Sequence, residues 1–211
     1  PYNIKGSIWY QGENNVSRFK EYETLFPAMI KDWRKKWNSD FPFYFVQIAP
    51  FENYNGLSSS LRNVQRKTLK VEKTGMVVTL DIGEIDDIHP SNKHDVGNRL
   101  AGLALSNDYG KSIVASGPLY KDFELSDNTL IVSFDFIGSG LTSHDKELSA
   151  FEIAGADKKY VKAKAYIENN KVYIYSSKIQ NPKYARYAWK DTSVASLFNK
   201  EGLPASTFTT E

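Results

Sequence analysis

The sequence predicts an α/β fold in two parts, a parallel sheet with crossover helices followed by an antiparallel, β-sandwich-like domain. Residues 1–115 alternate short apolar runs with segments in which apolar residues recur every three or four positions. From residue 116 onward, short alternating segments are separated by turn residues, and no helical period returns. We therefore expect two domains, 1–115 and 116–211, packed closely together because the join at 116–118 is short.

The first domain contains three units of a strand followed by a helix. The strands are expected at 4–10, 43–49 and 76–80, and the helices at 19–37, 57–71 and 91–110. Pro27 predicts a kink or a break near Phe26, Gly75 ends the second helix, and Ser91 can cap the third. Strands alternating with helices of this length favour a parallel sheet with crossover helices.

The second domain is expected to contain about five to seven short strands, arranged as an antiparallel sandwich. Residues 129–136, 161–167 and 184–189 read as strands. The pair Asn169–Asn170 lies between two alternating segments and predicts a two-residue hairpin turn into 172–175.

Composition excludes several classes of function. The net charge is +2, with 27 basic and 25 acidic residues, which gives no electrostatic reason to expect a nucleic-acid partner. Apolar stretches are too short to span a bilayer. The chain has no cysteine, which excludes disulfides, cysteine–zinc sites, iron–sulfur clusters and thiol catalysis. We expect neither a metal nor a cofactor.

Three polar segments follow the predicted strands, at 11–15, 49–53 and 81–90, and should meet at one edge of the sheet. His89 in the third segment follows Asp86 by three positions and Asp87 by two. A carboxylate at this spacing can hold the imidazole Nδ1–H and leave Nε2 free as a base. The alternative is a histidine that packs against or caps the start of the following helix.

The first segment offers donors for a developing negative charge. Gly12 lets the backbone approach a ligand closely, and the side-chain amides of Gln11, Asn14 and Asn15 can donate to an oxyanion. The alternative is a polar turn in which Asn15 or Ser17 caps the first helix.

Two blocks carry a resemblance to a known family. Ile8–Asn15 (IWYQGENN) resembles the WYQGE(S/N)N block of sialate O-acetylesterases, in the SGNH hydrolase superfamily, and Asp87–Lys93 (DIHPSNK) resembles their DIHPxNK block. Further blocks follow in the same order to the end of the chain: 25–30, 32–34, 41–47, 61–65, 116–120, 151–155, 186–189 and 202–205.

The resemblance implies part of an SGNH-type three-layer α/β/α domain and a carbohydrate esterase. Such an enzyme removes O-acetyl groups from sialic acid or related sugars by Ser–His–Asp acyl transfer. His89 matches the base. The orienting acid is Asp87 by the family block or Asp86 by the superfamily's Asp-x-x-His spacing, and we favour Asp87.

The other matching residues are assigned to the oxyanion and substrate site. Gln11, Gly12 and Asn15 match the oxyanion block, and Glu13 lies beside it. For Arg62 two roles are open, steering of the substrate or a surface ion pair on the second helix.

One departure from the family is large, because the nucleophile's GQSN-type block has no counterpart here. Ser7 lies inside a strand, and Ser58–Ser60 begin a helix without a glycine turn. The chain begins at Pro1, one step before a predicted strand. We therefore expect an N-terminal part of the same protein to supply the serine, a glycine oxyanion donor and one or two central strands. Acetylated glycans as substrates suggest a secreted or periplasmic protein whose signal peptide lies in that part.

Two other functions compete with the esterase. A metal-dependent hydrolase could collect a divalent ion at Asp81, Glu84, Asp86, Asp87 and His89. A non-catalytic carbohydrate-binding or accessory protein is suggested by the absent nucleophile and by aromatic residues of the second domain. Those aromatics are Tyr173, Tyr175, Tyr184, Tyr187 and Trp189, and core packing is the alternative for them.

Overall fold

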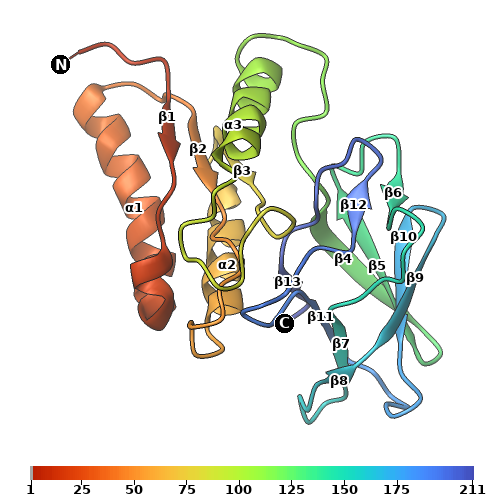
Figure 1. Ribbon diagram of the computed structural model, residues 1–211. Coiled ribbons are helices and arrows are strands. Elements are labelled where there is room, and N and C mark those ends of the chain that lie inside the picture. The colour runs from red at the N-terminus through yellow and green to blue at the C-terminus, as the bar shows by residue number, and fades with distance from the viewer. Residues whose placement is uncertain (1) are drawn as a thin grey trace.

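Alternate residues of one central strand point into two different cores, and this sets the layering of the first part. In the computed structural model, which describes residues 2–211, strand β2 (Phe43–Val46) is buried throughout. Phe43 and Phe45 pack under helices α1 (Phe19–Trp37) and α2 (Ser58–Lys67). Tyr44 and Val46 pack under helix α3 (Lys93–Asn107) on the other face. The result is a three-layer α/β/α arrangement, as predicted (Figure 1).

The sheet of the first part is parallel, in the order β1–β2–β3. Strand β1 (Ser7–Trp9) pairs with β2, which pairs with β3 (Thr74–Val77), so that Ile8, Tyr44 and Gly75 lie in one row. Short 3-10 helices, η1 (Glu13–Arg18) and η2 (Thr68–Lys70), complete the crossovers. All three strands therefore end at the same edge, which confirms the predicted topology.

Helix α1 differs from the expectation at its proline. It runs without a break from Phe19 to Trp37 with Pro27 inside it. Tyr22 and Phe26 on one side of the proline and Ile30 on the other are all buried against the sheet. Packing along this stripe outweighs the hydrogen bond that proline removes.

Two further boundaries differ from the prediction. Gly75 does not end the second helix but lies inside β3, where a Cβ would come within 2.9 Å of Tyr44 Cδ1 and 3.1 Å of Leu103 Cδ2. The cap of α3 is Asn92, whose side chain accepts from Asp95 N, and not Ser91. Ser91 instead bonds to Glu84 through both its N–H and its hydroxyl.

The second part consists of two four-stranded antiparallel sheets and a two-stranded one, more strands than predicted. The strands are β4 (Leu119–Ser126), β5 (Thr129–Asp135), β6 (Leu141–Thr142), β7 (Phe151–Ala154), β8 (Val161–Lys162), β9 (Lys164–Glu168), β10 (Lys171–Tyr175), β11 (Tyr184–Tyr187), β12 (Phe198–Asn199) and β13 (Phe208–Thr209). Asn169 and Asn170 both have positive φ and form the predicted turn between β9 and β10. The strand expected at 161–167 is interrupted at Ala163, where pairing changes from β7 to β10.

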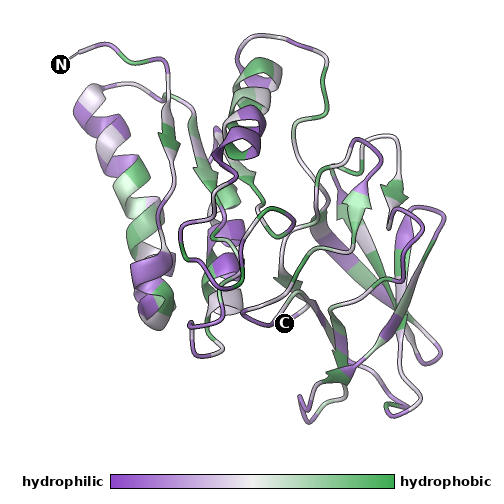
Figure 2. Cartoon of the chain, in the orientation of Figure 1, coloured by the Kyte–Doolittle hydropathy of each residue, from purple (hydrophilic) through white to green (hydrophobic). Residues whose placement is uncertain are grey.

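The two large sheets, β4–β5–β10–β9 and β13–β11–β7–β8, face each other across an apolar core. Phe208 of β13 stacks on Tyr120 at 5.0 Å and meets Phe134 edge-on at 5.6 Å. Hydrophobic colouring concentrates in the strands, whereas the connecting loops are mostly hydrophilic (Figure 2). No helix in residues 2–211 combines the length and apolar character needed to cross a membrane.

Buried polar groups join the two parts. Arg62 of α2 is fully buried and donates to Thr207 Oγ1, Ala188 O and Lys190 O at 3.0, 3.1 and 2.7 Å. Asp191 accepts from Gly56 N and from the backbone and hydroxyl of Ser58, at the start of α2. Helix α2 is therefore fixed to the β-sandwich by hydrogen bonds that water cannot replace.

Replacing Arg62 should test how much this junction contributes to stability. Arg62→Ala removes three hydrogen bonds and leaves a cavity in place of a fully buried side chain, and should lower the free energy of unfolding by about 3 kcal/mol or more. Arg62→Lys should recover only part of that, because an ammonium lacks the planar fork. Denaturant unfolding measures both, with the exposed Arg18→Ala as a control expected within about 0.5 kcal/mol of the parent. A parent-like Arg62→Ala would contradict this account.

Candidate active site at the carboxyl edge of the sheet

The segment after β1 is held against the sheet by one buried side chain, Gln65 of α2. Its amide accepts from Ile48 N at 2.9 Å and donates to Gln11 O and Val46 O, both at 3.3 Å. Gly12 has φ +154°, and a Cβ there would lie 2.9 Å from Ile48 Cγ2 and 3.0 Å from Gln65 Nε2. Only glycine fits this close approach without displacing its neighbours.

The amides of this segment form a connected chain. Tyr22 Oη donates to Gln11 Oε1 at 3.3 Å, and Gln11 Nε2 donates to Asn15 Oδ1 at 2.6 Å. Within residues 2–211, no backbone or side-chain acceptor takes the Gly12 N–H. The Gly12 N–H and the remaining amide hydrogens of Gln11 and Asn15 can therefore serve an oxyanion.

The loop after β3 is closed by its own hydrogen bonds. Asp81 forms a two-point ion pair with Arg99 of α3 at 2.8 and 2.5 Å. Glu84 accepts from Ser91 N at 2.8 Å and from Ser91 Oγ at 2.5 Å, and these bonds lower the pKa of the Glu84 carboxyl. Glu52 N donates to Ile85 O, so the segment after β2 supports this loop.

His89 stands at the tip of that loop with its side chain 88% exposed. Its Nδ1 lies 3.9 Å from Asp87 Oδ1, and the same oxygen accepts the His89 backbone N–H at 2.8 Å. Asp86 is exposed and makes no hydrogen bond or ion pair to His89. The structure therefore places Asp87, and not Asp86, beside the imidazole.

One open pocket of about 330 Å³ brings the first and third segments together. Tyr10, Gln11 and Glu13 line it from the end of β1. Ile88, His89 and Lys93 line it from the loop and the start of α3. Burial, together with the charge of Glu13, raises the pKa of Tyr10 to about 12, so its hydroxyl stays protonated at neutral pH. The imidazole of His89 and the amide-bearing residue Gln11 therefore line a common space, next to which Gly12 and Asn15 follow in the chain.

Arg62 does not join this pocket. Its guanidinium is buried at the junction with the β-sandwich, and burial lowers its pKa to about 10. The prediction that Arg62 forms a surface ion pair is wrong, because none of its side chain is exposed. Its partners are a hydroxyl and two carbonyls. The structure gives no contact between Arg62 and the space beside His89.

No serine in residues 2–211 lines the pocket beside His89. Ser58 and Ser59 are fully buried, and the Ser58 hydroxyl donates to Asp191. Ser7 lies in β1, four residues before Gln11. Ser91 is the serine nearest to His89 in the chain, and its hydroxyl is bonded to Glu84.

The acidic residues suggested for a metal are spread among other partners. Asp81 binds Arg99, Glu84 binds Ser91, and Asp87 binds the His89 backbone. Across the described part of the chain, no three histidine, aspartate or glutamate side chains are grouped so that they could hold a metal ion.

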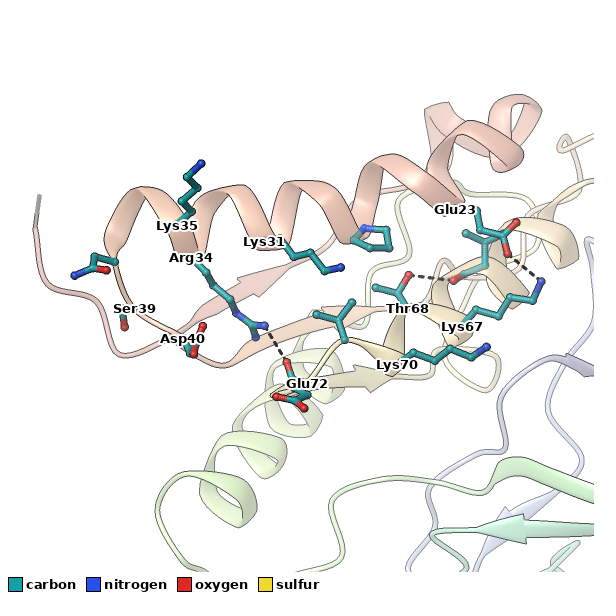
Figure 3. Close-up of a pocket in the computed structure, with 14 residues that line it drawn as sticks. Glu23, Lys31, Arg34, Lys35, Ser39, Asp40, Lys67, Thr68, Lys70 and Glu72 are labelled. Atoms are coloured by element: carbon teal, nitrogen blue, oxygen red, sulfur yellow. Dashed lines mark hydrogen bonds and ion pairs between the residues drawn. The ribbon is translucent and has the colours of Figure 1, made fainter.

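A larger cavity of about 950 Å³ lies elsewhere, between α1 and the segment that joins α2 to β3 (Figure 3). Arg34 reaches across it and donates to the carbonyls of Phe41, Glu72 and Lys73 at 2.9 to 3.0 Å. Glu23 and Lys67 form an exposed ion pair at its other end. The cavity shares no lining residue with the pocket beside His89, and its arginine serves to tie α1 to β3.

The residues that sequence reasoning left out are mainly supports. Gln65 and Tyr22 position the segment at Gln11, and a buried glutamine that bonds to two strand ends is visible only in three dimensions. Tyr10 and Lys93 lie within the two blocks that resemble the family, but no role was predicted for either residue.

Comparison with known proteins identifies relatives of both parts. Residues 2–106 match the family model described as carbohydrate esterase, sialic acid-specific acetylesterase. The sialate O-acetylesterase of Rattus norvegicus is 33% identical over 145 residues, which cover 58% of this chain and 27% of that protein. The Homo sapiens sialate O-acetylesterase is 30% identical over 145 residues, which cover 58% of this chain and 28% of that protein.

A solved structure resembles the whole chain. The crystal structure of a carbohydrate acetylesterase from Xanthomonas citri superposes with a TM-score of 0.95 at 37% identity, covering 100% of this chain and 51% of that one. The chain therefore spans about half the length of the Xanthomonas protein, and its matched segment spans less than a third of the mammalian relatives.

The bond between Ser91 and Glu84 should be measurable as a pKa. Because Ser91 stabilises the ionised carboxylate, Ser91→Ala should return the pKa of Glu84 toward its ordinary value. The loop closure is then present at neutral pH and lost as the pH falls through the lowered pKa of Glu84. A carbon-detected NMR titration of the glutamate side chains checks this, with Glu21 as an internal reference. An unchanged Glu84 pKa in Ser91→Ala would show that the bond does not form in solution.

Proposed function

We propose that this chain, which belongs to the carbohydrate esterase family of sialic acid-specific acetylesterases, forms part of an esterase. The enzyme would remove O-acetyl groups from sugars. The observation that carries the proposal is the pocket that joins the Gln11–Glu13 segment to His89 at one sheet edge. In open α/β sheets, ligands bind beyond the carboxyl ends of the strands, which is where this pocket lies.

In the proposed reaction His89 is the base and Asp87 orients it. The nucleophile's hydroxyl gives its proton to His89 Nε2 as its oxygen attacks the acetyl carbonyl carbon. The bond to the sugar oxygen then breaks, and that oxygen takes the proton from His89. Water repeats the sequence and releases acetate. The exposed imidazole has room to turn so that Nδ1 closes its 3.9 Å separation from Asp87.

The oxyanion is proposed to form beside Gly12. Its N–H has no protein acceptor in residues 2–211, and the amides of Gln11 and Asn15 are held nearby by Tyr22. Fixed donors aimed at a developing charge stabilise a tetrahedral intermediate more than its substrate. Glu13, in the same pocket, is available to accept from sugar hydroxyls.

We propose that a segment outside these 211 residues delivers the nucleophilic serine. Strand β1 pairs only with β2 in the described residues, and Ile8 on the α3 side of the sheet is 68% exposed. An additional parallel strand beside β1 would cover this edge and end next to Gly12. The greater length of the relatives is compatible with such a segment. A secreted or periplasmic location is proposed with it, because acetylated glycans lie outside the cytoplasm.

A second candidate function is carbohydrate binding by the β-sandwich. On the outer face of its first sheet, Tyr166 stacks on Tyr173 at 4.9 Å and meets Tyr175 edge-on at 6.3 Å. Tyr166 and Tyr175 are exposed, whereas Tyr187 is fully buried in the core. Sugar binding without acetate release by any form of the protein would favour this function.

Acetate release from O-acetylated sialic acid tests the esterase directly. The chain is compared with a version extended upstream to include the segment that pairs with β1. We expect activity only in the extended form, because the serine lies there. Activity of the 211 residues alone would place the nucleophile among their own serines.

Substitutions in the active form test the roles of the loop residues. His89→Ala should lower kcat by about 10² to 10⁴ without loss of folded structure, since His89 is exposed. Asp87→Asn should reduce kcat more than Asp86→Asn, because only Asp87 lies beside the imidazole. His94→Ala is the control, because His94 is an exposed histidine near the start of α3 that does not line the pocket. Near-normal turnover in His89→Ala would refute the assignment.

A further inference from the structure

A hollow of about 250 Å³ lies where helices α1 and α2 meet the β-sandwich. Phe19 of α1 and Trp189, two residues after β11, line it from opposite parts of the chain. Glu23 and Lys67 line both this hollow and the larger cavity, so the two spaces adjoin at that ion pair (Figure 3). We call the smaller space the junction hollow, and it shares no lining residue with the pocket beside His89.

Trp189 reaches the junction hollow because the backbone turns at Ala188. Side chains of a strand alternate between its faces, so Trp189 would follow the buried Tyr187 into the core of the sandwich. Ala188 instead has φ +52°, a left-handed conformation that costs free energy for a residue other than glycine. Trp189 is half-buried, and the centre of its ring lies 5.6 Å from Arg186 Cζ. An indole therefore stands in the wall of the hollow and does not fill the core.

Asn63 supplies hydrogen-bond donors that nothing in the described chain accepts. The residue is only 7% exposed and lines the hollow from α2. Its Oδ1 accepts from Arg66 Nε and Nη2 at 3.2 and 2.8 Å, which fixes the amide. Arg66 is itself held over the Tyr120 ring, 5.6 Å from the ring centre. No acceptor in residues 2–211 takes the hydrogens of Asn63 Nδ2, so a ligand that offers hydroxyl oxygens would satisfy them.

The charged side chains that line the hollow already have partners. Glu23 pairs with Lys67 at 3.0 Å, and Arg186 pairs with Glu152 at 2.8 Å. Glu211, the remaining one, accepts from a lysine and from a tyrosine hydroxyl, both at 2.6 Å. An ionic ligand would find no unpaired countercharge here, whereas hydroxyl groups can still bond to paired side chains. The hollow therefore fits a neutral ligand rich in hydroxyl groups.

We propose that the junction hollow binds one ring of a neutral glycan, as a second carbohydrate site separate from the pocket beside His89. The apolar C–H face of a pyranose packs on the Trp189 ring, and its hydroxyl oxygens accept from Asn63 Nδ2. The larger cavity continues from the hollow along α1, so neighbouring rings of a chain have room to extend from it. This site goes beyond the proposed esterase, because it holds a glycan without contact to an acetyl ester.

Calorimetric titration of the extended protein with unacetylated hexasaccharides of glucose, xylose and mannose tests the proposal. These sugars carry no ester, so the result is independent of esterase activity. We expect at least one to bind, and Trp189→Ala to weaken that binding about tenfold or more through loss of stacking. Asn63→Asp keeps the acceptor for Arg66 but removes the donors, and should weaken binding about tenfold. Tyr109→Ala, which removes an exposed aromatic that lines neither space, is the control.

Trp189→Phe keeps an aromatic face and should retain most of the binding, which separates stacking from a loss of folded structure. The proposal would be overturned if no neutral hexasaccharide bound, if Trp189→Ala bound as the parent does, or if a galacturonate hexasaccharide bound at least as tightly. A loss in Tyr166→Ala in place of Trp189→Ala would also contradict it, and would move the glycan to the outer face of the first sheet. A protein that binds these sugars but releases no acetate would refute the esterase and support this second site.

Discussion

Gln65 joins the ends of two neighbouring strands through a single buried amide, and the geometry of the pocket depends on it. Its oxygen takes the N–H of Ile48, and its nitrogen reaches the carbonyls of Gln11 and Val46. After β1 the chain passes this amide at Gly12, where a Cβ would lie 3.0 Å from Gln65 Nε2. Because buried backbone groups are costly to leave unpaired, the oxyanion segment has little freedom to move. The donors that we propose for the oxyanion are therefore in place before any substrate arrives.

Helix α2 connects this support to the β-sandwich. Gln65 lies one turn from Arg62, whose guanidinium binds two carbonyls and a hydroxyl of the second part. Gln47, just after β2, donates to both Arg62 O and Ser206 Oγ. The larger of the two apolar cores also runs through both parts. The β-sandwich therefore supports helix α2, which positions the segment after β1. The loop with His89 is held separately, by the contacts of Arg99 with Asp81 and of Ser91 with Glu84.

The parallel sheet and the meeting of the Gly12 and His89 segments could be predicted, because strand ends of a parallel sheet share an edge. The role of Arg62 could not, since its partners are 126 to 145 residues away in sequence. Ser91 was predicted to cap the third helix, but its N–H and hydroxyl bond to Glu84, seven residues earlier, and Asn92 is the cap instead. The break predicted at Pro27 does not occur, because burial of Tyr22, Phe26 and Ile30 against the sheet outweighs the hydrogen bond that proline removes. Local patterns thus identified the elements, and long-range polar contacts decided the details.

We propose that acyl transfer occurs between the Gln11–Glu13 segment and His89. A crystal structure of the active enzyme after reaction with a fluorophosphonate, which forms a stable mimic of the tetrahedral intermediate, tests this most directly. We expect a phosphonyl group in the pocket lined by Tyr10 and His89, with its oxygen facing the Gly12 N–H. An adduct in the cavity between α1 and α2, or on Ser58 or Ser59, would contradict it.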